Sequence, residues 1–121
     1  MYFVGCDLGS TAGKAVVLER CGRGLVLAGS AVEPSGLSPD ETADLVVGKA
    51  LAAVGRSAPL RQVRRSDVAA ICCTGYGREN VASVPHNVSE ITCHARGAHF
   101  LRPSTRTIVD VGGQDVKAIA V

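Results

Sequence analysis

MYFVGCDLGSTAGKAVV, residues 1–17, is the stretch that decides the fold, because it places an acid and a glycine turn between two apolar strands. Asp7 ends the first strand, a Gly-Ser-Thr turn follows, and Lys14 stands at the start of the second strand. A Walker A loop needs G-x-x-x-x-G-K followed by Ser or Thr. Here three residues instead of four separate Gly9 from Gly13, and an alanine follows the lysine. We therefore do not expect a P-loop.

The composition fits one compact domain. A chain of 121 residues with 46% hydrophobic content is long enough to bury one core and too short for two. The net charge of +2 and the aromatic content of 3% do not provide the surface that nucleic-acid binders use, so we expect no nucleic-acid partner. No apolar run approaches the roughly 20 residues of a membrane span, and the N-terminus lacks the basic region of a signal peptide. We expect a cytoplasmic protein without a membrane partner.

The cysteines support the same compartment. Their number, 5, is odd and their spacing is irregular, which favours free thiols in a reducing environment over a disulfide framework. Adjacent Cys72 and Cys73 should point to opposite faces of a strand. A metal site built from the cysteines and histidines would lack the usual zinc spacing. Buried or free thiols are therefore the expected state.

Apolar segments between glycine-bearing turns predict an antiparallel three-stranded meander at the start of the chain. A helix should follow, because Ser38 can cap it, Pro39 suits its first position and Glu41 completes a capping box. Its apolar stripe should cover the sheet, and Gly55 is a plausible stop. The three strands are expected at residues 2–8, 14–19 and 24–32. The stripe consists of Ala43, Val47, Ala50, Leu51 and Val54.

The second half of the chain alternates strands and helices. The continuous apolar run at residues 68–74 suits a parallel strand that is covered on both faces. A Gly-Tyr-Gly-Arg turn follows this strand. The elements expected next are a short amphipathic helix at 78–83, a short strand at 84–89, a helix at 90–101, and two strands at 107–110 and 116–121 joined by a glycine turn.

Two hairpins share one plan. In each, an aspartate ends an apolar strand, glycine and polar residues form the turn, and a lysine follows: Asp7 with Lys14, and Asp110 with Lys117. Glycines let backbone N–H groups approach an anion, and lysine neutralises its charge. The aspartates would bind Mg²⁺ through its waters, as carboxylates beside phosphates usually do. One such turn could be only a β-turn; two with the same order favour phosphate binding.

The motifs GCDLGSTAGK, TGYGR, SEITCHARGAHFL and IVDVGGQDVKAI span nearly the whole chain. Together they resemble the N-terminal half of the ATPases that activate 2-hydroxyacyl-CoA dehydratases and benzoyl-CoA reductases, members of the superfamily of sugar kinases, actin and heat-shock chaperones. The resemblance implies an α/β fold: a ribonuclease-H-like (actin-like ATPase) lobe with three antiparallel strands followed by alternating helices and parallel strands. It assigns residues 1–102 to that lobe, and residues 103–121 to a linker and the first hairpin of an incomplete second lobe.

The resemblance also assigns roles to individual residues. Asp7 and Asp110 would be catalytic and would hold Mg²⁺ through water, and Glu90 would help to position the attacking water. The residues that would bind ATP or ADP are Gly9, Ser10, Thr11 and Lys14 in the first motif, and Gly112, Gly113 and Gln114 in the second.

The resemblance implies a function in which ATP hydrolysis drives electron transfer. In the family, a homodimer bridged by a [4Fe-4S] cluster passes one low-potential electron to a dehydratase or reductase partner. The cluster is expected only in the full-length protein, because the cluster-binding cysteines and the adenosine motif lie outside this chain. This chain alone is therefore expected to be inactive.

Two alternatives remain open at this point. The chain could be a truncated or split subunit without catalysis that needs a second chain. It could also be a metal-dependent nuclease of the ribonuclease-H-like fold, with Asp7, Glu90 and Asp110 as its carboxylate set. The near-neutral charge and the phosphate-type turns count against the nuclease.

Overall fold

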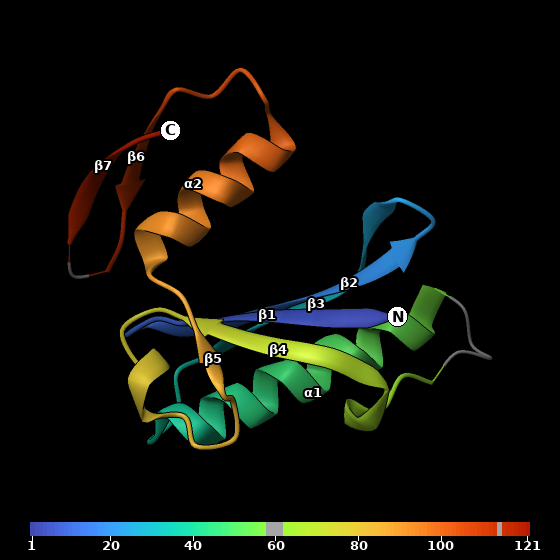
Figure 1. Cartoon of the computed structure of the whole chain (residues 1–121). Coiled ribbons are helices and arrows are strands. Elements are labelled where there is room, and N and C mark those ends of the chain that lie inside the picture. Colours follow the sequence, from blue (N-terminus) through green and yellow to red (C-terminus); the bar gives the residue numbers. More distant parts are fainter. Residues whose placement is uncertain (58–61, 114) are drawn as a thin grey trace.

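The computed structural model describes residues 1–57, 62–113 and 115–121 and confirms the predicted α/β fold. One sheet has five strands in the order β3-β2-β1-β4-β5, and a second sheet contains β6 and β7. In Figure 1, α1 lies on one side of the larger sheet, and α2 and the β6–β7 hairpin lie on the other. The elements are β1 (Tyr2–Leu8), β2 (Ala12–Cys21), β3 (Gly24–Pro34), α1 (Pro39–Ser57), the 3₁₀ turn η1 (Arg65–Asp67), β4 (Val68–Thr74), the 3₁₀ turn η2 (Arg78–Asn80), β5 (His86–Asn87), α2 (Glu90–Leu101), β6 (Thr107–Val111) and β7 (Val116–Ala120).

The predicted antiparallel meander is confirmed. β1 pairs with β2 and β2 pairs with β3, both antiparallel. β2 and β3 are longer than predicted: they also pair at the end away from their shared turn, where Ala12 lies opposite Pro34, and β2 continues to Cys21 because that turn is tight. Gly22 has φ +60°, a left-handed conformation that glycine adopts without strain, and it allows Cys21 to pair with Gly24.

Helix α1 begins as predicted. The amide of Glu41 donates to Oγ of Ser38 at 3.2 Å, so Ser38 caps the helix. The predicted apolar stripe is buried, and Val46, which that stripe omitted, is fully buried as well. Gly55 as a stop is wrong, since the helix continues to Ser57. A glycine costs a helix only about 1 kcal/mol, too little to end one that is packed along a sheet.

The core of the protein fills the space between the larger sheet and α1. Side chains that point to the same face of β1 and β2 meet the stripe of α1, as expected from the period of two in strands. The largest fully buried side chains are Val17, Val46, Val47 and Cys73. Among the described residues, no helix is long and apolar enough to cross a membrane.

Strand β4 is parallel to β1, as predicted. The expectation that both of its faces are covered is wrong, because only Cys73 and Thr74 are buried and Ala69 is exposed. Cys73 belongs to the core cluster and Val68 and Ile71 pack against it, whereas Ala69 lies at an irregularity in the pairing of β4 with β1. The neighbouring positions Cys72 and Cys73 differ in burial, which agrees with their predicted opposite directions.

Two elements after β4 are shorter than predicted. The helix expected at residues 78–83 is only the 3₁₀ turn η2. Val81 becomes extended at its end and is buried against the core, which draws the chain out of the helical path. The strand expected at residues 84–89 is reduced to β5, which pairs in parallel with Cys72 and Cys73.

The last three elements agree closely with prediction. Helix α2 has the predicted bounds, and Oγ of Ser89 caps it by accepting a hydrogen bond from the amide of Thr92 at 3.3 Å. No described residue of α2 is buried. β6 and β7 form an antiparallel hairpin whose Ile119 is buried. The boundary between residues 102 and 103 stays a prediction.

Candidate functional site

The turns of the two hairpins meet. A Cβ atom added to Gly113, in the β6–β7 turn, would lie 2.7 Å from Oγ1 of Thr11 and 3.7 Å from Oγ of Ser10, both in the β1–β2 turn. Only a residue without a side chain allows this approach. Segments about a hundred positions apart in sequence therefore form the two walls of one site.

A cleft of about 440 Å³ lies between these walls. Gln114 is outside the described residues, but all the other predicted site residues line the cleft: Asp7, Gly9, Ser10, Thr11, Lys14, Glu90, Asp110, Gly112 and Gly113. The cleft thus contains the predicted phosphate-binding and carboxylate groups together. Their individual roles stay predictions.

The cleft also contains residues that sequence reasoning did not assign to a site. For two of them the sequence carried a signal. His94 follows Glu90 by one helical turn, and Lys117 occupies the lysine position of the second hairpin. Lys117 was named in the second hairpin but not assigned as a binding residue, and the residues missed altogether are Ala12, Tyr76, His94, Val111 and Asp115.

The first hairpin is held rigidly at its turn. Nζ of Lys14 lies 3.0 Å from Oδ2 of Asp7, its direct neighbour across the strands. The amide of Gly9 donates to the carbonyl of Ala12 at 3.2 Å, and Oγ of Ser35 donates to the carbonyl of Gly9 at 2.7 Å. The carboxylate and the ammonium therefore lie side by side at the mouth of a fixed turn.

The turn after β4 packs directly beneath Asp7. Gly75 has φ +92°, and a Cβ there would lie 2.6 Å from Oδ1 of Asp7 and 2.7 Å from the amide nitrogen of Leu8. The amide of Gly77 donates to the carbonyl of Leu8 at 3.1 Å. Tyr76, between these glycines, is 81% exposed and borders the cleft. The glycines of TGYGR therefore position the end of β1.

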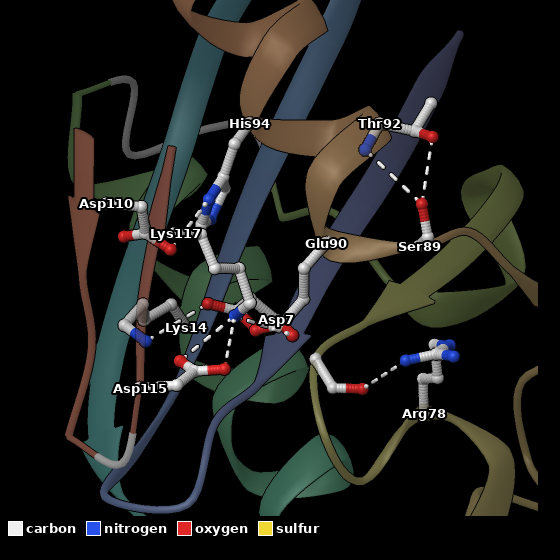
Figure 2. Close-up of polar contacts among 11 residues, drawn as sticks. Asp7, Lys14, Arg78, Ser89, Glu90, Thr92, His94, Asp110, Asp115 and Lys117 are labelled. Atoms are coloured by element: carbon white, nitrogen blue, oxygen red, sulfur yellow. Dashed lines mark hydrogen bonds and ion pairs between the residues drawn. The ribbon is translucent and has the colours of Figure 1, made fainter. Parts of the chain in front are cut away.

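The second hairpin is tied to the first two turns of α2, as Figure 2 shows. Nζ of Lys117 lies 2.9 Å from Asp115 Oδ2 and 3.4 Å from Glu90 Oε2. Nδ1 of His94 lies 3.2 Å from Oδ2 of Asp110. The hydrogen bond to Asp115 and the charge of Glu90 raise the pKa of Lys117 above its ordinary value, so this lysine is a cation at neutral pH.

Three of the thiols lie on the paired strands β1 and β4. Cys6 and Cys73 are buried neighbours on β1 and β4. A hydrogen bond between them and burial raise the pKa of the Cys6 thiol, and the same hydrogen bond lowers the pKa of Cys73. Burial also raises the pKa of Cys72. All the cysteines are free, in agreement with the prediction from the sequence.

The donors in the cleft fit a hydrated magnesium ion. Both carboxylates, Asp7 and Asp110, line the same space, and oxygen donors with retained water are what Mg²⁺ prefers. Oδ1 of Asp7 and Oγ1 of Thr74, on paired positions of β1 and β4, are buried without a hydrogen-bond partner in the described structure. Such orphaned oxygens are where a bound water is expected.

The carboxylate set of a two-metal nuclease is not formed. Among the described residues, no group of three or more His, Cys, Asp or Glu side chains is arranged to hold a metal ion. Glu90 is paired with Lys117, and Asp110 is in contact with His94. The nuclease alternative therefore has no support from the geometry.

The comparison with known families agrees with this site. The model of the BadF/BadG/BcrA/BcrD ATPase family matches residues 4–121. The chain belongs to this family. The matched residues include both hairpin turns, and the resemblance to the BadF/BadG/BcrA/BcrD ATPases found in the sequence motifs is confirmed.

Relatives within this family activate dehydratases. The activator of 2-hydroxyisocaproyl-CoA dehydratase from Clostridioides difficile is 38% identical over 120 residues, 98% of this chain and 41% of that protein. The activator of lactoyl-CoA dehydratase from Anaerotignum propionicum is 40% identical over 119 residues, 98% of this chain and 42% of that protein. The chain thus spans less than half the length of these relatives.

Solved structures of activators have the same fold. The 2-hydroxyisocaproyl-CoA dehydratase activator from Clostridium difficile with bound ADPNP superimposes with a TM-score of 0.83 at 37% identity, covering all of this chain and 41% of that one. Component A of (R)-2-hydroxyglutaryl-CoA dehydratase from Acidaminococcus fermentans gives 0.84 at 30% identity, covering all of this chain and 43% of that one. The fold of an activator ATPase is therefore shown for this chain.

Proposed function

We propose that this BadF/BadG/BcrA/BcrD ATPase chain forms the phosphate-binding part of an activator that couples ATP hydrolysis to electron transfer. The electron would pass from a [4Fe-4S] cluster to a 2-hydroxyacyl-CoA dehydratase or benzoyl-CoA reductase. The observation that carries the proposal is the contact between the two hairpin turns, which brings Asp7 and Asp110 to one cleft. The bound ADPNP in a structural relative supports a nucleotide as the occupant.

Each wall of the cleft supplies groups that suit a polyphosphate. The hydroxyls of Ser10 and Thr11 and the backbone amide of Gly113 are candidate donors for phosphate oxygens, whereas the amide of Gly112 donates to the carbonyl of Asp115 at 2.8 Å. Lys14, at 3.0 Å from Asp7, adds a cation beside the carboxylate. Such a site acts through positioning and electrostatics, because phosphoryl transfer needs little covalent participation from the protein.

Asp7 and Asp110 would hold Mg²⁺ through its waters, and Glu90 would orient the attacking water. A bound Mg²⁺ would neutralise charge on the phosphates. Asp7 suits this role because it lines the cleft and because the turn below it fixes the end of β1, where the amide of Gly77 donates to the carbonyl of Leu8. Glu90 is at the first turn of α2, where its movement would be transmitted to the helix.

A second candidate function follows from the length of this chain relative to its relatives. The chain covers only 41% of a relative that binds ADPNP, so it could be one half of a clamp that is inactive without a second chain. The cluster, the homodimer and the dehydratase or reductase partner would then belong to the complete assembly. We place this assembly in the cytoplasm, because all the cysteines of the chain are free.

The proposal is tested by MgATP hydrolysis with the chain and a complementary half supplied together. Asp7→Ala and Asp110→Ala should each lower hydrolysis at least tenfold, whereas Asp44→Ala, an exposed carboxylate paired with Arg65 outside the cleft, should not. Undiminished hydrolysis in both cleft variants would exclude the proposed site. Calorimetric titration of MgATP into the 121-residue chain separates the two candidates, since binding that requires Asp7 would show a working site in this half alone.

A further inference from the structure

The two hairpins pair their aspartate and lysine in the same register but not in the same way. Asp7 lies directly opposite Lys14, and Asp110 lies directly opposite Lys117. In the first hairpin the two side chains form an ion pair of 3.0 Å. In the second, both residues are described and yet they form no ion pair with each other. The two hairpins thus share the same backbone register but differ in how their aspartate and lysine side chains are paired.

Helix α2 contacts both members of the second pair, in addition to the contact between Lys117 and Asp115 within the hairpin. Glu90 and His94 are four positions apart and therefore lie on the same face of the helix. Glu90 is 3.4 Å from Nζ of Lys117, and His94 is 3.2 Å from Oδ2 of Asp110. Glu90 thus contacts the lysine of the cross-strand pair and His94 contacts its aspartate. Figure 2 shows both helix side chains directed at the hairpin.

The arrangement matters for a cation bound near Asp110. Oppositely charged residues directly across an antiparallel pair attract each other. An ammonium beside Asp110 would compete with Mg²⁺ for this carboxylate, as the ammonium of Lys14 already does for Oδ2 of Asp7. Groups that orient a ligating carboxylate commonly change metal affinity by about 10–100-fold. In this structure the ammonium of Lys117 is instead held by Glu90 and by Asp115, at 2.9 Å from the latter.

We propose that His94 is a positioning residue that keeps Asp110 apart from Lys117 and so keeps the Asp110 carboxylate available to the divalent cation of a nucleotide. This inference rests on the proposed function, because it deepens the role of the same cleft. His94 holds the carboxylate from the helix side, and Glu90 holds the competing lysine. Neither contact requires His94 to touch the nucleotide.

The test uses electron paramagnetic resonance to measure the affinity of the 121-residue chain for the Mn²⁺–ADP complex. His94→Ala should weaken binding about tenfold, because Asp110 loses its partner on the helix and becomes free to pair with Lys117. The double variant His94→Ala/Lys117→Met should regain most of the affinity, since the competitor is gone. His94→Ala/Lys49→Met is the matched control: Lys49 is paired with Glu33 outside the cleft, and its loss should restore nothing.

Two outcomes would overturn the inference: an unchanged Mn²⁺ affinity in His94→Ala, or a loss that removal of Lys117 does not reverse. A second readout needs no ligand. In carbon-13 NMR spectra, His94→Ala should shift the carboxylate resonance of Asp110, and adding Lys117→Met to that variant should shift it back. An unshifted resonance in His94→Ala would show that His94 does not keep Asp110 apart from Lys117. If the wild-type chain binds no MnADP, this half has no working site of its own, and the NMR result still decides the inference.

Discussion

Gly113 lies against Thr11, and this contact joins the two walls of the cleft. A Cβ at position 113 would come within 2.7 Å of Oγ1 of Thr11, which is closer than real Cβ contacts allow. The turn of the last hairpin can therefore reach the turn of the first hairpin only because residue 113 is glycine. The width of the cleft depends on this contact.

Gly113→Ala should push the two turns apart and weaken MgATP binding severalfold, with little change in the stability of the core, because the added methyl group meets the exposed residues Ser10 and Thr11. Calorimetric titration and thermal unfolding measure the two effects separately. Gly48→Ala is the control: a Cβ there meets nothing within 4 Å, and alanine should stabilise α1 by roughly 0.5–1 kcal/mol. Equal nucleotide affinity in the wild type and Gly113→Ala would refute the importance of the contact.

Gly75→Ala should destabilise the protein by about 1–3 kcal/mol, because a φ of +92° is strained for any residue with a side chain. The added Cβ would also meet Oδ1 of Asp7, so the carboxylate should be displaced. Urea unfolding measures the stability. Gly97→Ala in α2 serves as the comparison, because a Cβ there has open space. A Gly75 variant as stable as wild type would show that the turn can relax without cost.

The stabilising contribution of Lys117 should depend on pH in a defined direction. Its pKa is raised above 10.5 by Asp115 and Glu90, so its ion pairs stabilise the folded state fully below the pKa of the unfolded chain. The contribution is lost as the pH rises through the higher pKa of the folded state. The difference in melting temperature between wild type and Lys117→Met should therefore be constant between about pH 7 and 9, and should shrink above pH 10.5.

The matched control for this pH series is Lys49→Met, which removes an exposed lysine paired with Glu33. It reports the general loss of stability at alkaline pH. A Lys117 difference that already disappears near neutral pH would mean that the raised pKa, and the ion pairs that cause it, do not exist in solution.

The cysteines should differ strongly in reactivity. Cys21 is exposed at the β2–β3 turn, whereas Cys6 and Cys73 are buried at 2% and 1% exposure. The thiolate is the reactive form, and burial blocks access to it, so a thiol reagent at pH 8 should modify Cys21 rapidly and the buried pair only on unfolding. Although the pKa of Cys73 is lowered by Cys6, its burial should dominate. Mass spectrometry of a labelling time course gives the order, and early modification of Cys73 would contradict the packing.

Local sequence patterns predicted the framework of the fold well. Ser38 followed by Pro39 specified the start of α1, and the Asp-Gly-Lys order specified both hairpins. These features follow from short-range chemistry: capping, turn formation and alternation along a strand. Where prediction failed, distant contacts decided the outcome. Val81 ended the helix expected at residues 78–83 because the core took up its side chain, and Gly55 did not end α1 because the sheet supports the helix.

The sequence by itself determined the two hairpins, the helix between them and the residues that carry charge at each turn. Only the tertiary structure decided that Gly113 touches Thr11, and that Glu90 and His94 of α2 divide the pair Asp110 and Lys117 between them. A strand register depends on neighbouring residues and can be read locally. The ion-pair partner of a charged side chain depends on which element packs beside it. This packing is established only when the chain has folded.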